Sequence, residues 1–292
     1  SSLEWDSPLG LADQLMLRGG RDAVSDHQRT SHSEMLFYNL PFGWWNVSYS
    51  YSQSAYRSRA QANGFSFKQT GDTQNHQLRV ERVVHRDNLS KTSLNSGLAY
   101  LRSNNYIEDS KLANSSNRLS EAQFGINHGR RIGGAFVNLD LGLQQGIGAF
   151  DAQSGRTERA SDPDARYRKY TATLSYLQPF RLGSESFTFS SLMTGQRSED
   201  PLYSPQRMSL GGLSSVRGYK DQSLTGDSGG YWRNDLRWSR PVQTEWLRPV
   251  LGEYGVSVGY DQGVIRGDRF NDDQHGRVSS NSLEPVSYTH LR

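Results

Sequence analysis

The chain has 292 residues with no cysteine, a formal net charge of +3, 34% hydrophobic residues and a mean hydropathy of -0.76. No run of residues approaches the roughly 18 consecutive apolar positions that a membrane-spanning helix needs, which excludes a helical membrane protein. The near-neutral charge gives no sign of a nucleic-acid partner. A transmembrane β-barrel is compatible with this composition, because only every second residue of its strands faces lipid.

Apolar and polar residues alternate along most of the chain, with interruptions rich in Gly, Asn, Asp and Ser, which predicts an all-β protein. In chain order we expect strands at residues 3–6, 13–19, 34–40, 44–52, 65–86, 92–103, 119–131, 135–144, 170–176, 186–198, 231–239 and 254–261. These are about twelve strands of roughly ten residues, the length that a tilted membrane strand needs.

Two of these segments show the alternation most clearly. The odd positions of 135–144 are Ala, Val and three Leu, while the even positions after Phe136 are polar or Gly. In residues 254–260 Tyr and Val alternate with Gly and Ser. One apolar and one wet face predict the wall of a transmembrane antiparallel β-barrel, and a soluble β-sandwich is the alternative.

The connections between the expected strands alternate between short and long. Short ones lie at residues 8–10, 41–43, 87–89, 132–134, 181–183 and 241–247, and long ones at 21–32, 53–63, 104–117, 149–165 and 201–230. Bacterial outer-membrane barrels have short periplasmic turns and long external loops. The pattern therefore favours a barrel over a sandwich and places the loop at 201–230 outside.

That loop contains Val216, Arg217, Gly218 and Tyr219, reached through a Gly pair. Such a loop can fold back into a barrel lumen and place one cation there. The alternation of residues 254–260 puts Asp261 on the lumen face, where it can form a charge-assisted pair with Arg217 that is shielded from bulk water. Asp235 lies on the lumen face of its own strand and is a second candidate partner.

The loop motif and the later run Gly259-Tyr260-Asp261-Gln262-Gly263 resemble the Val-Arg-Gly-Tyr/Phe and aromatic/Gly-x-Asp-x-Gly elements of the outer-membrane transporters of two-partner secretion, the TpsB family. The resemblance covers nearly the whole chain. It implies that Val216, Arg217, Gly218 and Tyr219 form a gating loop held by the barrel wall at Asp261 and Gly263.

The resemblance further implies a Gram-negative outer-membrane protein of the BamA-like superfamily, with a barrel of about sixteen strands preceded by periplasmic POTRA domains. It would export a large exoprotein of haemolysin, adhesin or contact-dependent-inhibition type, as a monomer in contact with membrane lipid, and without catalysis. On this reading the chain is a fragment: residues 1–275 form part of the barrel, and residues 276–292 lose the alternation and read as a tail outside it that resembles cloning sequence.

Three further features bear on function. Arg233 and Arg237 point into the lumen by parity, either as a hydrophilic lining or as partners for other lumen charges. The run at 226–230, Gly-Asp-Ser-Gly-Gly, matches the nucleophile segment of chymotrypsin-like proteases, but no histidine has the matching context. No histidine has metal-ligand spacing, so we expect no metal or other cofactor. A BamA-like insertase is the alternative function, and a plain porin or outer-membrane hydrolase would give the loop motif no role.

Overall fold

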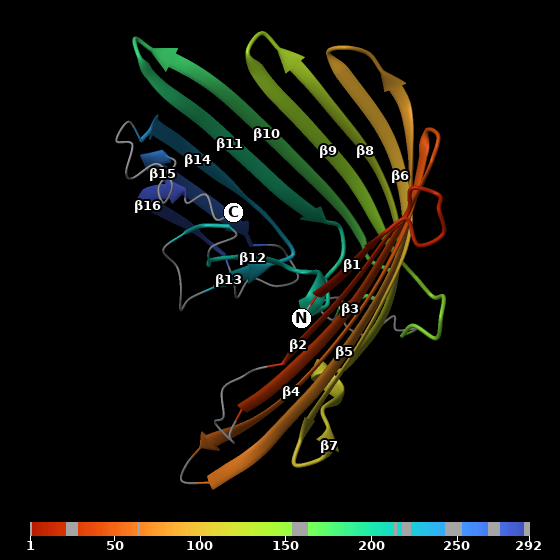
Figure 1. Cartoon of the computed structure of the whole chain (residues 1–292). Helices are drawn as coiled ribbons and strands as arrows, with labels where there is room; N and C mark the ends of the chain where they lie inside the picture. Colours follow the sequence, from red (N-terminus) through yellow and green to blue (C-terminus); the bar gives the residue numbers. More distant parts are fainter. Residues whose placement is uncertain are drawn as a thin grey trace.

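The structure is a computed structural model that describes residues 2–21, 29–62, 65–153, 163–212, 215–217, 223–242, 253–267 and 275–288. One curved antiparallel sheet dominates it (Figure 1). Its strands follow chain order: β1 (Ser2–Asp6), β2 (Gln14–Arg21), β3 (Arg29–Phe42), β4 (Trp45–Ala62), β5 (Phe65–Arg86), β6 (Ser90–Ile107), β8 (Asn117–Ile132), β9 (Ala135–Ile147), β10 (Arg168–Leu182), β11 (Glu185–Ser198), β14 (Ser228–Pro241), β15 (Glu253–Arg266) and β16 (Gly276–Tyr288). The all-β antiparallel prediction is confirmed.

Five small elements complete the described chain. Strand β7 (Ser110–Lys111) pairs with β6, and the strands β12 (Met208–Leu210) and β13 (Leu224–Gly226) form a separate hairpin. The 3-10 helices η1 (Ala113–Ser115) and η2 (Ser204–Gln206) precede β8 and β12. No helix in the described ranges is long and apolar enough to cross a membrane.

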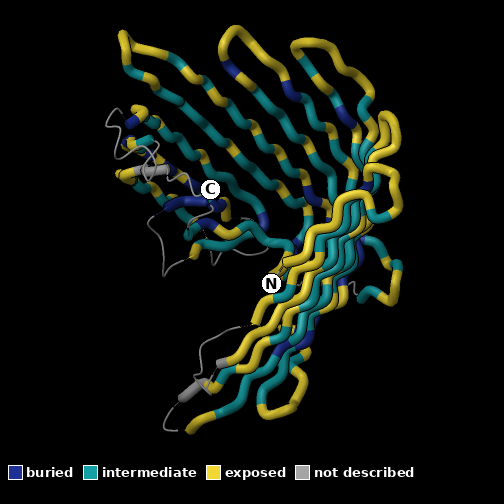
Figure 2. Tube along the Cα trace, viewed as in Figure 1, coloured by how far each residue is buried: buried dark blue, intermediate teal, exposed yellow. Residues whose placement is uncertain are grey.

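The two faces of the sheet differ in polarity as the alternation predicts. Along β15 the side chains of Tyr254, Val256, Val258 and Tyr260 are exposed on one face, whereas Asp261 on the opposite face is buried. The register aligns like with like across strands: Leu174 lies opposite Leu139 on one side and Met193 on the other. We call the apolar side the outer face, and Figure 2 shows exposed and less exposed residues alternating along the strands.

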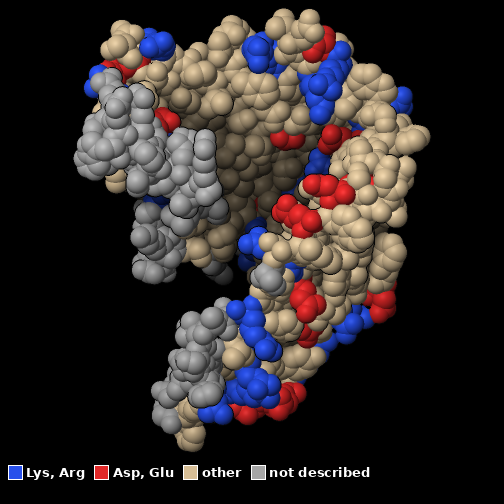
Figure 3. Space-filling view, viewed as in Figure 1, with Lys and Arg blue, Asp and Glu red and all other residues tan. Residues whose placement is uncertain are grey.

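The opposite side, the inner face, is polar. Figure 3 shows the concave side of the sheet, where acidic and basic side chains are interspersed. The β12–β13 hairpin lies on this side, inside the curve (Figure 1). The described residues form no second layer on the sheet, so within this part of the chain the polar groups of the inner face are covered where a loop folds onto them.

Three short connections are confirmed as tight turns. Gly43, Gly133 and Gly183 each open a two-residue turn with φ of 58°, 58° and 64°. Only glycine adopts this backbone conformation without strain, and turns of this kind match the twist of an antiparallel hairpin.

The prediction of a long loop at residues 53–63 is wrong, because β4 continues to Ala62 and β5 begins at Phe65. Where a strand pair extends beyond the apolar part of the sheet, both of its faces contact water. Its sequence then loses the alternation of apolar and polar residues by which a strand is recognised. Its backbone groups still pair across the whole length, from Trp45↔Arg82 to Ala62↔Phe65.

The prediction that residues 276–292 lie outside the sheet is also wrong for Gly276–Tyr288, which form β16 and pair with β15 over their whole length. Only Leu283 supplies a large apolar side chain to the outer face of this strand, which explains why its alternation is weak. The exposed edge of β15 nevertheless provides a ladder of backbone partners. Residues 289–292 lie outside the described residues.

Candidate functional site

The loop between β11 and β14 brings Arg217 to the inner face of the sheet. Within it β12 and β13 pair over Met208↔Gly226, Ser209↔Thr225 and Leu210↔Leu224, and Arg217 belongs to the segment that joins them. This hairpin contacts β14 and β15. The loop between β11 and β14 is thereby folded back along the inner face.

Arg217 makes a fork of hydrogen bonds to Asp261 of β15. Its Nε donates to Oδ2 at 2.8 Å, its Nη2 donates to Oδ1 at 2.7 Å, and its backbone N–H donates to Oδ2 at 3.0 Å. The planar guanidinium matches a carboxylate in this two-pronged geometry, which is the strongest form of charge-assisted hydrogen bond between side chains.

Asp235 of β14 completes the site. Its Oδ1 accepts a hydrogen bond from Nη1 of Arg217 at 2.5 Å. The side chain of Asp261 is 2% exposed and that of Arg217 11%, whereas Asp235 is 25% exposed. The two acids that the sequence offers as alternatives therefore bind one arginine together, and we call Arg217, Asp235 and Asp261 the latch.

The latch has a fixed charge. The hydrogen bond to Asp261 raises the pKa of Arg217 above its ordinary value, so the guanidinium stays protonated. Arg233 lies opposite Asp261 in the β14–β15 register and Asp235 lies opposite Gly259, so two acidic and two basic groups share this part of the wall. Their charges balance, which lowers the cost of holding them away from water.

Apolar contacts seat the loop beside the latch. Val216 is fully buried and Leu210 is 1% exposed. A β-carbon on Gly263 would lie 2.9 Å from Cδ1 of Leu210 and 3.0 Å from Cγ2 of Val216. Gly263 therefore leaves the space that these two side chains fill, and the latch is combined with hydrophobic burial worth roughly 1.5–3 kcal/mol per side chain.

Gly259 is a site residue that the sequence analysis named in the motif run but gave no role. A β-carbon there would overlap Nη2 of Arg217 and Oγ of Ser282 of β16. Any side chain larger than hydrogen would push the guanidinium off Asp261. The available signal was its position two residues before Asp261, on the same face of the same strand.

The other predicted site residues are less closely involved. Gly218 and Tyr219 lie outside the described residues. Nη2 of Arg237 lies 3.8 Å from Oε1 of Glu253 near the other end of the wall, away from the latch. The lumen side of β14 thus carries one arginine beside the latch and one paired elsewhere.

The base of the loop is held by Asp227, which is 3% exposed. Its Oδ1 accepts hydrogen bonds from the backbone N–H of Leu202 at 3.3 Å and pairs with Nε of Arg207 at 3.1 Å. Oγ of Ser228 accepts from the N–H of Ser198 at 3.0 Å. The Asp and Ser of the protease-like run are thus engaged in joining the loop to the strands.

A second buried polar cluster lies on the inner face, near the base of the loop between β11 and β14. The sequence analysis did not predict it. Tyr167, which is fully buried, donates a hydrogen bond from its OH to Oε2 of Glu121, and Gln123 donates to Oε1 of Glu121 at 2.6 Å. Burial raises the pKa of Tyr167, and the charge of Glu121 and the hydrogen bond to it raise it further. Nζ of Lys169 donates to Oε1 of Gln206 in η2 at 3.0 Å. The cluster joins β8 and β10 to the loop that precedes β10 and to the loop between β11 and β14.

The described residues contain no group of three His, Cys, Asp or Glu side chains that could hold a metal ion. The arginine and the two carboxylates of the latch satisfy one another. The arrangement can hold or release a loop, and it presents no nucleophile with an adjacent base.

Comparison with known proteins identifies close resemblances over the whole sheet. Residues 1–284 match the family described as haemolysin secretion/activation protein ShlB/FhaC/HecB. The outer membrane transporter CdiB of Dickeya dadantii is 33% identical over 271 residues, which cover 93% of this chain and 47% of that protein. The hemolysin transporter protein ShlB of Serratia marcescens is 31% identical over 247 residues, covering 85% and 44%. The chain thus spans about half the length of these relatives.

Two solved structures have folds similar to that of this chain. CdiB from Escherichia coli superposes with a TM-score of 0.88 at 30% identity, over 98% of this chain and 52% of that one. BamA from Haemophilus ducreyi, in a form lacking POTRA domains 1-3, gives a TM-score of 0.56 at 13% identity, over 99% of this chain and 62% of that one. The second likeness is one of fold alone.

Proposed function

Because the chain belongs to the family of haemolysin secretion/activation proteins ShlB/FhaC/HecB, we propose that it forms the wall and gate of an outer-membrane transporter that exports a large partner protein. The names of its relatives suggest a haemolysin or a contact-dependent-inhibition protein as the cargo class. The proposal places the chain in the outer membrane of a Gram-negative bacterium, as a monomer.

The exposed apolar side chains support the membrane placement. They lie on one face of neighbouring strands, where Leu78 is opposite Leu98, Ile126 opposite Leu141, and Leu174 opposite Met193. A water-soluble sheet would cover such a face with a second layer, whereas a lipid bilayer solvates it directly.

The latch is the single observation that carries the gating role. Four hydrogen bonds join Arg217 to Asp235 and Asp261, and the loop tip that they hold lies on the polar inner face. Removing one partner of a buried ion pair costs roughly 3–5 kcal/mol, because the other charge remains without a counter-ion. A cargo chain that displaces the loop would have to compensate the same loss, so the closed arrangement is the resting one.

The proposal includes no covalent step. The free energy for moving the cargo would have to come from outside this chain. Our hypothesis is that it comes from folding of the exported protein beyond the membrane. An insertase role is not favoured, because the likeness to BamA is limited to the fold while the transporters share about a third of their residues with this chain.

Replacement of the arginine tests the proposal. In the complete protein we expect Arg217→Ala to abolish release of the cargo into the medium while the barrel keeps its heat-dependent shift in gel mobility. Arg217→Lys should retain partial secretion, because a lysine keeps the charge but not the fork. Arg79→Ala is the control, since Arg79 lies on the inner face at 45% side-chain exposure and pairs only at 3.4 Å with Glu81. Normal secretion by Arg217→Ala would refute the gate.

A further inference from the structure

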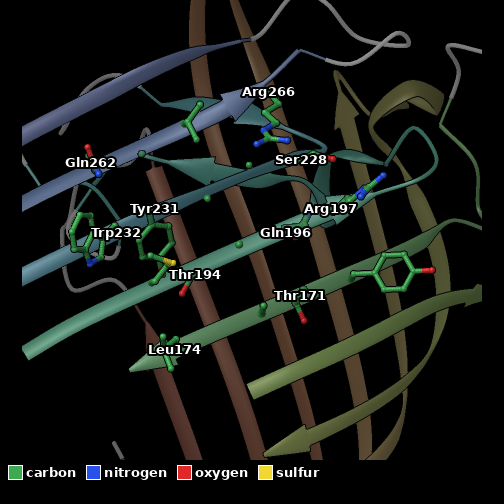
Figure 4. A pocket seen from close by; sticks show the side chains of 18 of the residues that line it. Thr171, Leu174, Thr194, Gln196, Arg197, Ser228, Tyr231, Trp232, Gln262 and Arg266 are labelled. Atoms are coloured by element: carbon green, nitrogen blue, oxygen red, sulfur yellow. The ribbon is translucent and has the colours of Figure 1, made fainter. Parts of the chain in front are cut away.

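A hollow of about 1350 Å³ lies on the outer face of the sheet, across β9, β10, β11, β14, β15 and β16. An outer barrel face is normally convex, so a hollow there has to come from the side chains. Its walls are exposed apolar groups that include Tyr170, Leu174, Met193 and Trp232. Figure 4 shows Leu174 and Trp232 at one end of it and Arg197 and Arg266 at the other.

The pairing of residues across the strands explains the depth of the hollow. Ala172 lies opposite Gly195 and Gly195 opposite Gly230, so one row across β10, β11 and β14 carries almost no side-chain volume, and Val264 of β15 closes this row. The next row toward the short turns is bulky, with Leu174 opposite Met193 and Met193 opposite Trp232. The floor is therefore a trough of small residues with an apolar wall along one side.

The other side of the trough is basic. Arg197 of β11, Arg266 of β15 and Arg277 of β16 line it, and all three are exposed. Arg197 and Arg266 are two strand spacings apart, which is about 10 Å. Arg277 lies opposite Val264, one step along the outer face from Arg266. None of the three forms an ion pair with a described residue, and the carboxylate of Glu199 is engaged by Arg168 and by the OH of Tyr170.

These arginines lie at the long-loop end of their strands, where β11 and β15 end and β16 begins. With short turns toward the periplasm, this end meets the outer leaflet at the level of the lipid head groups. Three like charges around one trough repel one another unless an anion lies between them. Arginine pairs with phosphate through two parallel hydrogen bonds, and the apolar trough next to it fits hydrocarbon chains.

We propose that this hollow is a binding site for one anionic, acylated lipid of the outer leaflet that carries a phosphomonoester, with its phosphate between Arg197, Arg266 and Arg277 and an acyl chain in the trough over Gly195 and Gly230. The site rests on the proposed membrane placement and is separate from the latch, which is on the opposite face. It would fix the outer wall against the lipid where β14 and β15 carry Asp235 and Asp261.

The test measures bound lipid by native mass spectrometry on the complete protein in detergent, with three probes: diphosphorylated lipid A, phosphatidylcholine and inorganic phosphate. We expect lipid A to be retained and the other two not, which distinguishes an acylated phosphate from phosphate alone or from a neutral lipid surface. Arg197→Gln with Arg266→Gln should weaken lipid A binding by about tenfold for each arginine. Gly195→Leu should also weaken it, because leucine fills the trough while both arginines remain.

Arg168→Gln is the matched control, because Arg168 already pairs with Glu199 and should not contribute. Equal retention of lipid A by the wild type, the double arginine variant and Gly195→Leu would overturn the site, as would retention of inorganic phosphate at the same level. Secretion measured on the same variants separates the two proposals. A wild type that secretes its cargo but retains no lipid A refutes only the lipid site.

Discussion

The two halves of the sheet differ in what covers their inner face. All nine buried apolar residues of the described chain lie from Leu119 onward, in or against β8 to β15, and none lies in β1 to β6. In the later half the inner loops carry Tyr167, Leu202, Leu210 and Val216 onto the wall. Among the described residues of the earlier half, no buried apolar side chain covers the inner face.

The comparison shows that this protein has no core in the usual sense, because a single sheet can bury side chains only where its own loops cover them. The most buried charged side chain of the described wall strands, Asp261, lies under the loop that carries Arg217. Stability beneath the loops and the proposed closure of the lumen therefore depend on the same contacts. Substitutions should have large effects in the covered half and small effects at matched positions in the open half.

The largest difference is expected for glycine on the inner wall. Gly259→Ala should displace Arg217 from Asp261 with every charge still present, and reduce secretion nearly as far as Arg217→Ala. Gly20→Ala in the open half meets only the hydroxyl of Ser33 at 3.2 Å and should leave secretion unchanged. Cargo in the medium is the measurement. Equal secretion by both variants would remove the distinction between the halves.

A smaller difference is expected for tyrosine hydroxyls. Tyr167→Phe leaves buried Glu121 without one hydrogen bond and should lower the free energy of unfolding by about 1–3 kcal/mol. Tyr56→Phe removes a hydrogen bond to Asn105 from a side chain that is 45% exposed, and should cost less than about 1 kcal/mol. Urea titration of the two proteins in detergent compares them, and an equal loss would contradict the account.

The smallest effect is expected at an exposed turn of the open half. Hydrogen bonds from the backbone N–H groups of Leu89 and Ser90, and from His85, lower the pKa of Asp87 from 3.8 to about 2. The folded state thus favours the charged carboxylate, so its stabilising contribution is complete above pH 3.8 and is lost as the pH falls through 2. Asp87→Asn should reduce stability slightly at pH 7, and the difference should shrink as the pH falls through 2. A difference from the wild type that is as large at pH 2 as at pH 7 would show that charge is not its source.

Much of this fold could be predicted from alternation, because period two identifies both a strand and its faces. That is why the outer positions of β15 and the lumen side of Asp261 were predicted correctly. Alternation placed Gly259 on the same face as Asp261, but it does not report what covers a face, so neither the close contact of Gly259 with Arg217 nor the contact of Tyr167 with Glu121 was predicted. Wet strand extensions such as the end of β4, and the weakly patterned β16, depend on backbone pairing with a neighbour that has no local signature.

The absence of cysteine from the chain permits a direct test of whether the loop rests on the inner wall. A β-carbon on Gly263 would lie 3.0 Å from Cγ2 of Val216, and the remaining bond adds about 1.5 Å at most, so Val216→Cys with Gly263→Cys places two β-carbons within reach of a disulfide. In the complete protein this pair should cross-link spontaneously and block secretion, with export restored by a reductant. Undiminished export by the fully cross-linked protein would contradict the account.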